Sequence, residues 1–137
     1  MKLPLKIIDA NVILRFLLAD DKRLFPKARN FIQRLESGEE EVLLTELIFA
    51  EVVWVLHKVY EVPRKEINER FSTLIKFQGI KTLWDKDLFV ASLGYYSEQS
   101  IDIQDIFLAV LSKKMQAQVI TFDKKDFKKL GASFAEP

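Results

Sequence analysis

The feature that most restricts how this chain can fold is the alternation of short apolar runs with longer segments of helical periodicity. The apolar runs are residues 5–8, 42–44, 80–84 and 118–121, and residues 132–135 are a candidate for a fifth. Short, mostly apolar runs of this kind are typical of strands that are buried on both faces of a sheet. Parallel strands need crossover connections, which are usually helices. The alternation therefore predicts an α/β fold, a three-layer α/β/α sandwich around a central, mostly parallel sheet of four to five strands.

Start and stop signals mark a helix between each pair of runs. Asn11 and Thr45 are the expected N-caps of two helices, Pro26 and Pro63 stand at the start of two more, and Gly79 ends one. The expected helices cover residues 12–19, 26–37, 45–60, 63–78, a segment that starts at 85 or 87 and includes 95, a segment from 100–102 to about 115, and a short basic stretch after 123. Right-handed crossovers bring the carboxyl ends of the strands to one edge of the sheet, where ligands bind in such folds.

Composition excludes several kinds of site. The chain has 137 residues, which suits a single domain spanning 1–137 with its own core. It has no cysteine, which excludes disulfides, Cys–zinc sites and thiol nucleophiles. His57 is its one histidine and is expected at the surface, so a His-rich metal site or a Ser-His-Asp triad is disfavoured. With four glycines and no Gly-x-Gly-x-x-Gly after the first strand, a Rossmann dinucleotide site is disfavoured too.

The apolar start of the chain is too short for a secretory signal, and no stretch approaches the roughly 18 apolar residues of a membrane span. We therefore expect a cytoplasmic protein. The net charge of +1 favours no class of partner. The lysines are concentrated in the last quarter of the chain, at positions 113, 114, 124, 125, 128 and 129.

Four carboxylates stand at the ends or within the most apolar segments: Asp9, Glu51, Asp105 and Asp123. A buried carboxylate costs several kcal/mol, roughly, and carboxylates drawn together raise one another's pKa. A bound divalent cation removes both penalties. We therefore interpret these four residues as a metal site, with Asn11 and Thr121 as supporting polar groups near the same sheet edge.

Glu51 is the most informative of the four. Its helical neighbours at i±3 and i±4 are all apolar, so its face of the helix should be buried. A buried salt bridge or a side chain that reaches out to water would also account for it.

The three aspartates have structural alternatives. Asp9 suits a helix N-terminus, Asp102 and Asp105 resemble a capping box, and Asp123 suits a turn. Asp126 is expected to be solvated. Only their joint placement at one sheet edge favours a site.

Segments 8–14, 45–51, 102–105 and 120–123 together resemble the PIN-domain ribonucleases, and among them the VapC-like toxins of prokaryotic toxin–antitoxin pairs. The match runs over nearly the whole chain, with the motifs in the expected order. The chain departs from the family in having Ile106 and Phe107 after the third acid, where small residues are common.

The resemblance implies a Mg²⁺ or Mn²⁺ site, endonucleolytic cleavage of RNA, a homodimer and a cognate antitoxin protein. Such an ion lowers the pKa of a bound water for attack on a phosphodiester. The candidate cations for the RNA phosphates are Arg15, Lys113, Lys114, Lys124 and Lys125. Phe122 and Phe127 are expected to pack in the core, although base stacking is an alternative.

Other functions stay open. A PIN domain can serve RNA processing instead of acting as a toxin, or be a catalytically silent scaffold that binds RNA or protein. A phosphoacceptor receiver domain would use Asp85, but it leaves Glu51 and Asp105 unexplained.

Overall fold

The computed structural model describes residues 4–137; residues 1–3, part of the N-terminal stretch assessed for a secretory signal, lie outside the described part. The helices are α1 (Ala10–Leu18), α2 (Phe25–Ser37), α3 (Glu46–Trp54), the π-helical segment η1 (Val55–Val59), α4 (Arg64–Ile75), α5 (Lys86–Glu98), α6 (Ile103–Met115) and α7 (Lys124–Lys129). The strands are β1 (Val42–Leu43), β2 (Ile80–Lys81), β3 (Val119–Ile120) and β4 (Phe134–Ala135). The predicted alternation of helices and short strands is thus confirmed.

Two predicted helix starts had different outcomes. Thr45 is the N-cap of α3, and its hydroxyl accepts a hydrogen bond from the Ile48 amide at 3.3 Å. The prediction that Asn11 is a cap was wrong, because α1 begins earlier, at Ala10. Asp9 takes that role, and its Oδ1 accepts from the Ala10 amide at 2.9 Å. An acidic N-cap is favoured because it meets the positive end of the helix dipole.

The strands pair in parallel, as predicted, but in two separate pairs. β1 pairs with β2, with Val42 opposite Ile80, and β3 pairs with β4, with Val119 opposite Phe134. The predicted strand at 5–8 contributes an isolated parallel bridge from Ile7 to β1. The residues 4–137 therefore hold two two-stranded sheets, where a single sheet of four to five strands between helical layers was predicted.

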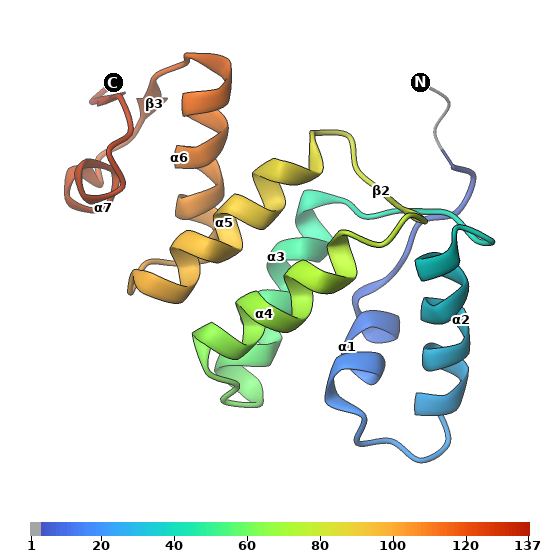
Figure 1. Cartoon of the computed structure of the whole chain (residues 1–137). Helices are drawn as coiled ribbons and strands as arrows, with labels where there is room; N and C mark the ends of the chain where they lie inside the picture. The colour runs from blue at the N-terminus through green and yellow to red at the C-terminus, as the bar shows by residue number, and fades with distance from the viewer. Residues whose placement is uncertain (1–3) are drawn as a thin grey trace.

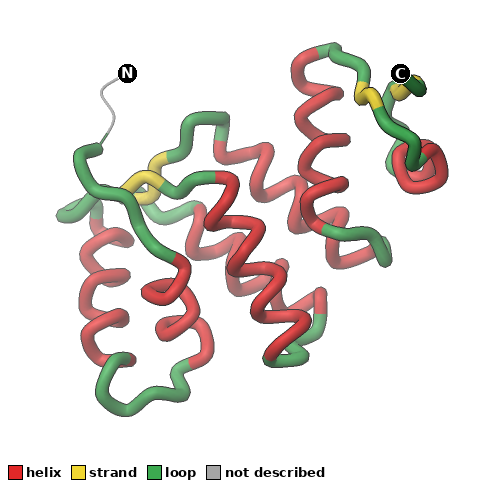
Figure 2. Tube along the Cα trace, turned by 180° about the vertical axis from the view of Figure 1, so that it is seen from behind, coloured by secondary structure: helices red, strands yellow, loops and turns green. Residues whose placement is uncertain are grey.

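The two pairs lie at opposite sides of the molecule. In Figure 1, α6, α7 and β3 stand on one side and α1 and α2 on the other, with α3, α4 and α5 between them. Figure 2, seen from behind, shows the same separation of the two strand pairs. We call residues 4–98 the N-terminal body and residues 103–137 the C-terminal unit.

An aromatic cluster joins the two parts. Phe49 of α3 lies with its ring centroid 5.5 Å from Phe71, 5.0 Å from Phe89 and 6.0 Å from Phe107. Phe107 belongs to α6, so the first half of that helix is seated in the core of the N-terminal body. Buried aromatic pairs of this kind stabilise by area and by ring geometry.

The corner between α5 and α6 is held by one guanidinium. Nη1 of Arg64 donates to the carbonyls of Tyr96, Gln99 and Ile101 at 3.2, 2.7 and 2.8 Å. The same guanidinium stacks 3.9 Å from the centre of the Tyr96 ring. These contacts fix the direction in which α6 leaves the N-terminal body.

Gly79 lies where β2 begins, against the end of α2. Its amide donates to the Leu35 carbonyl at 2.7 Å. A Cβ at this position would lie 2.8 Å from that carbonyl oxygen and would also meet the Glu40 carbonyl. Only glycine allows this close approach of two backbone segments.

Within residues 4–137, none of the helices combines the length and the apolar character that crossing a lipid bilayer requires.

Candidate metal centre

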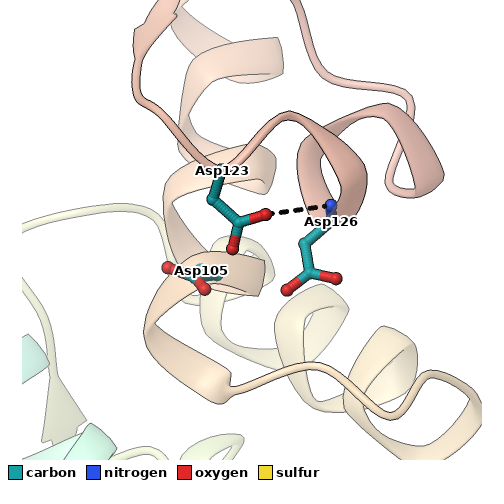
Figure 3. Close-up of side chains that lie close together, drawn as sticks. All are labelled: Asp105, Asp123 and Asp126. Carbon is teal, nitrogen blue, oxygen red and sulfur yellow. Dashed lines mark hydrogen bonds between the residues drawn. The ribbon is translucent and has the colours of Figure 1, made fainter.

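Three aspartates of the C-terminal unit point toward one another (Figure 3). Asp105 lies in the first turn of α6, Asp123 is the N-cap of α7, and Asp126 lies in the first turn of α7. One carboxylate oxygen from each lies within 4.8 Å of the others. The packing of α7 against α6 brings the three together.

Local hydrogen bonds shape this cluster. The Asp123 amide donates to the Thr121 hydroxyl at 2.9 Å, and the Asp126 amide donates to Oδ1 of Asp123 at 3.4 Å. Thr121 therefore supports the turn that presents Asp123. Within residues 4–137, the other carboxylate oxygen of Asp123 takes part in none of these hydrogen bonds.

The electrostatics of the cluster favour a cation. Partial burial raises the pKa of the Asp105 carboxyl above its ordinary value, and the charge of Asp123 raises it further. Asp102 and Asp126 add smaller effects in the same direction. Within the described part of the chain, no lysine or arginine forms a salt bridge with these carboxylates. Convergent oxygen ligands without a cationic partner fit a hard divalent ion.

Asp126 was missed as a candidate. The signal was its spacing, because Asp123 and Asp126 are three residues apart at a helix start, where N-cap and N3 side chains meet. The capping box predicted at Asp102 and Asp105 does not form, since the N-cap Asp102 makes no side-chain capping hydrogen bond. Asp105 is thus free for the cluster.

The two other predicted ligands lie elsewhere. Asp9 is exposed as the N-cap of α1, a helix that α3, α4 and α5 separate from the C-terminal unit (Figure 1). Glu51 is exposed on α3, so the prediction of a buried face there was wrong. That face carries Leu47, 80% exposed, and Trp54, 56% exposed, because α3 packs through Phe49 and its neighbours instead. Among residues 4–137, neither Asp9 nor Glu51 joins the aspartate cluster.

The candidate phosphate-binding cations differ in whether their side chains already bind other groups of the protein. Lys113 donates to the Leu130 carbonyl at 2.6 Å and Lys124 pairs with Glu136 at 2.8 Å, so both hold the C-terminal unit together. Arg15, in the N-terminal body, is bonded to neighbouring side chains of its own region. Lys114 and Lys125 are exposed on α6 and α7.

The predictions for the two phenylalanines and for the histidine had different outcomes. Phe127 is buried in the core, as predicted, whereas Phe122 is 80% exposed, so its predicted core role was wrong. Phe122 immediately precedes Asp123 in the sequence. His57, expected at the surface, is partly buried, with Nδ1 3.1 Å from the Val62 carbonyl oxygen.

Asn11 is exposed and lines, with Asp9 and Arg15, a mostly apolar groove of about 560 Å³ beside α1 and α2. This groove lies on the N-terminal body, apart from the aspartate cluster. Asn11 therefore does not support the three clustered carboxylates in this arrangement.

The chain is thus a short α/β domain with three aspartates gathered at the starts of α6 and α7. The PIN domain family profile matches residues 6–132, so the chain belongs to the PIN domain family. It is 25% identical over 134 residues to the VapC ribonuclease of Aquifex aeolicus (strain VF5), an alignment that covers 97% of each chain. The resemblance of the four sequence motifs to PIN domains and to VapC proteins is thereby confirmed.

Proposed function

We propose that this protein is an endoribonuclease that hydrolyses RNA phosphodiester bonds with the help of Mg²⁺ or Mn²⁺. The observation that carries the proposal is the convergence of Asp105, Asp123 and Asp126 without a cationic partner in the described structure. A relative of nearly equal length that is named a ribonuclease supports the reaction. The oxygen-only ligand set and the absence of cysteine from the chain favour a hard ion over zinc.

The three aspartates would hold the ion, and the ion supplies Lewis acidity and an activated water at neutral pH. The protein's own part is to hold the carboxylates in place. Thr121 holds the turn at Asp123. Asp105, partly buried on α6, gives the centre a fixed wall on its protein side.

The surroundings of the cluster suit a single-stranded polyanion. Lys114 and Lys125 are exposed and free to meet phosphates. Phe122 directly precedes Asp123 in the sequence and is exposed, so that an unpaired base can stack on its ring. We therefore favour single-stranded RNA, read through its backbone and one stacked base, as the substrate.

The relative named VapC supports the finer proposal that this ribonuclease is the toxin of a toxin–antitoxin pair. The protein would then act on RNA in the cytoplasm, form a homodimer and be neutralised by a cognate antitoxin protein. Expression of the chain alone should arrest growth, and co-expression of the product of an adjacent small open reading frame should restore it. Cleavage of RNA without growth arrest would favour a role in RNA processing instead.

The test of the reaction is cleavage of a fluorescent single-stranded RNA by the pure protein. Cleavage should require Mg²⁺ or Mn²⁺, stop on addition of EDTA, and be lost in Asp123→Asn. The matched control is Asp85→Asn at the start of α5, where asparagine caps a helix as well as aspartate does. Binding of RNA without cleavage by the unaltered protein would identify a silent scaffold. Labelling of Asp85 by acetyl phosphate would favour the receiver chemistry.

A further inference from the structure

A small pocket lies where residues of α3, η1, α4, α5 and the start of α6 meet. Its volume is about 100 Å³, which gives room for one small planar group in place of a few water molecules. Its polar and aromatic lining consists of Trp54, Lys58, Arg64, Tyr96, Asp102 and Gln104. Aromatic rings, cations and a carboxylate together indicate a ligand that differs from the metal ion of the acidic cluster.

Part of this lining is fixed by contacts inside the protein. The Arg64 guanidinium lies 3.9 Å from the centre of the Tyr96 ring, and its Nη1 bonds the three carbonyls at the corner before α6. Tyr96 is buried and also meets the ring of His57 edge-on, with 6.0 Å between the ring centroids. A lining that is already ordered lowers the entropy that a ligand must give up on binding.

The π-helical segment η1 carries the exposed part of the lining. Its widened turn is closed by the Tyr60 amide, which donates to the Val55 carbonyl at 3.2 Å. Trp54 directly precedes the segment and is 56% exposed, and Lys58 lies four residues further on and is exposed. Residues four apart lie on one side of a helical segment, and π-helical turns are frequent at functional sites.

Two opposite charges line the pocket without pairing. Within residues 4–137, neither Lys58 nor Asp102 forms a salt bridge. Asp102 is the N-cap of α6, but its side chain makes no capping hydrogen bond. A ligand with an anionic group and a set of hydrogen-bond donors would satisfy both residues.

A nucleotide of single-stranded RNA has these parts. Its phosphate suits a lysine, its base stacks on an aromatic ring, and the edge of its base is read by hydrogen bonds. Guanine alone among the four bases presents two adjacent N–H donors, at N1 and N2, that match the two oxygens of one carboxylate. Its O6 acceptor lies beside them and suits the amide of Gln104.

We propose that this pocket binds one guanine base of single-stranded RNA. The base stacks on Trp54, its N1 and N2 donate to the Asp102 carboxylate, and Lys58 meets a phosphate of the same strand. Adenine and cytosine offer one amino group each, and uracil offers one ring N–H, so each leaves part of the carboxylate without a donor. Asp102 is therefore the residue that determines the preference for guanine.

The pocket adjoins the acidic cluster along α6. Asp102 and Gln104 line the pocket, whereas Asp105, three residues after Asp102, belongs to the cluster. Residues three apart are neighbours on a helix surface. A guanine held in the pocket would thus bring a nearby phosphate toward the aspartates and select where the strand is cut. That the strand is cut rests on the proposed function, but the binding of guanine does not.

Binding without metal tests the pocket apart from cleavage. Fluorescent heptanucleotides of uridine with one central guanosine, inosine or adenosine would be titrated with the protein in EDTA. The guanosine RNA should bind about tenfold more tightly than the adenosine RNA, because a two-point contact to a base edge gives discrimination of this order. The inosine RNA should bind with intermediate affinity, since it lacks the N2 amino group. Equal binding of the three RNAs would overturn the proposal.

Asp102→Asn tests the assigned carboxylate. Asparagine caps a helix as well as aspartate does, so the start of α6 should stay folded. The variant should lose most of the guanosine preference and bind the adenosine RNA about as well as the unaltered protein. Asp85→Asn, at the N-cap of α5, is the matched control and should keep the preference. A preference that survives in Asp102→Asn would contradict the assignment.

The other two residues should act on every RNA alike. Trp54→Ala should weaken binding about tenfold through loss of stacking. Lys58→Gln should weaken it by a similar factor for each RNA and lower the salt dependence of binding by about one ion. Lys76→Gln, exposed at the end of α4, is the control for charge. Unchanged binding by Trp54→Ala or Lys58→Gln would place the RNA elsewhere.

Cleavage in Mn²⁺ separates this proposal from the proposed function. A guanosine preference in EDTA with no cleavage in Mn²⁺ would mean that the ribonuclease proposal fails and the guanine pocket stands. Cleavage of the three RNAs at equal rates, with equal binding in EDTA, would mean that the ribonuclease stands and the guanine pocket fails.

Discussion

The carboxylates of the C-terminal unit lie close together, whereas those of the N-terminal body lie apart. In the C-terminal unit, Asp105, Asp123 and Asp126 converge because α6 and α7 pack directly on each other. In the N-terminal body, Asp9 caps α1 and Glu51 stands exposed on α3, each away from other acids. Neighbouring helices therefore bring three acids together on their own, whereas the acids of the N-terminal body stay apart from them.

The largest expected effect tests the core that joins the two regions. Phe49→Ala should lower the free energy of unfolding by about 3–5 kcal/mol, because it empties the centre of the aromatic cluster. Urea denaturation of the purified variant measures this. Leu47→Ala on the same helix is the control and should change it by less than about 0.5 kcal/mol if its exposed side chain touches nothing. A larger loss in the Leu47 variant would show that the open face of α3 is covered in solution.

The next effect concerns the acids. Asp123→Asn should lower RNA cleavage about 100-fold or more, since losing a ligand exceeds the effect of losing one of its supports. Single-turnover cleavage at saturating Mn²⁺ measures it, and activity near that of the unaltered protein would place the chemistry elsewhere. Asp9→Asn sharpens the comparison: an equal loss joins the N-terminal carboxylate to the same centre, and unchanged cleavage leaves the C-terminal unit sufficient.

A smaller effect tests the corner between the regions. Arg64→Met should cost about 1.5–3 kcal/mol of stability, because three carbonyls lose a charged donor. It should also speed proteolysis between α5 and α6, measured by limited digestion. Arg70→Met on the same helix removes only an exposed pair with Glu66 at 4.0 Å and should change little. Equal behaviour of the two variants would contradict the anchoring role.

The smallest effect is a pH dependence. Because the pKa of Asp105 is raised in the folded protein, the folded state binds more protons than the unfolded chain between that raised pKa and about 3.8. Stability of the metal-free protein should therefore gain from this group as the pH falls through that window. Thermal unfolding of the unaltered protein and of Asp105→Asn at several pH values measures the difference, which should vanish in the variant. Mn²⁺ affinity should fall in the same window, and a rise would reverse the assigned sign.

Much of the fold followed from periodicity. The turn and cap signals at Thr45, Pro63 and Gly79 placed helix boundaries to within a few residues, because these signals act through local backbone chemistry. The parallel pairing of the strands also followed from their connection by helices. Which pairs meet did not follow, since the direction of α6 is set by Arg64 and Phe107, whose partners are distant in sequence.

The candidate site, like the fold, was predicted from the sequence only in part. Asp105 and Asp123 were identified and lie together, whereas Asp126 was passed over because an acid after a helix start is commonly solvated. The prediction that Glu51 lies on a buried face was wrong, and it rested on the apolar neighbours of Glu51 along the helix. An apolar face indicates that something covers it, but it does not say whether the cover comes from the same chain.

The close approach at Gly79 has a genetic consequence. Any side chain there would push the start of β2 away from the end of α2, and β1 with it. In a screen that uses the proposed growth arrest, inactivating alleles should therefore fall at this codon as well as at the acidic ones. Alleles at codon 79 should reduce the amount of folded protein, whereas those at the aspartates should leave it intact.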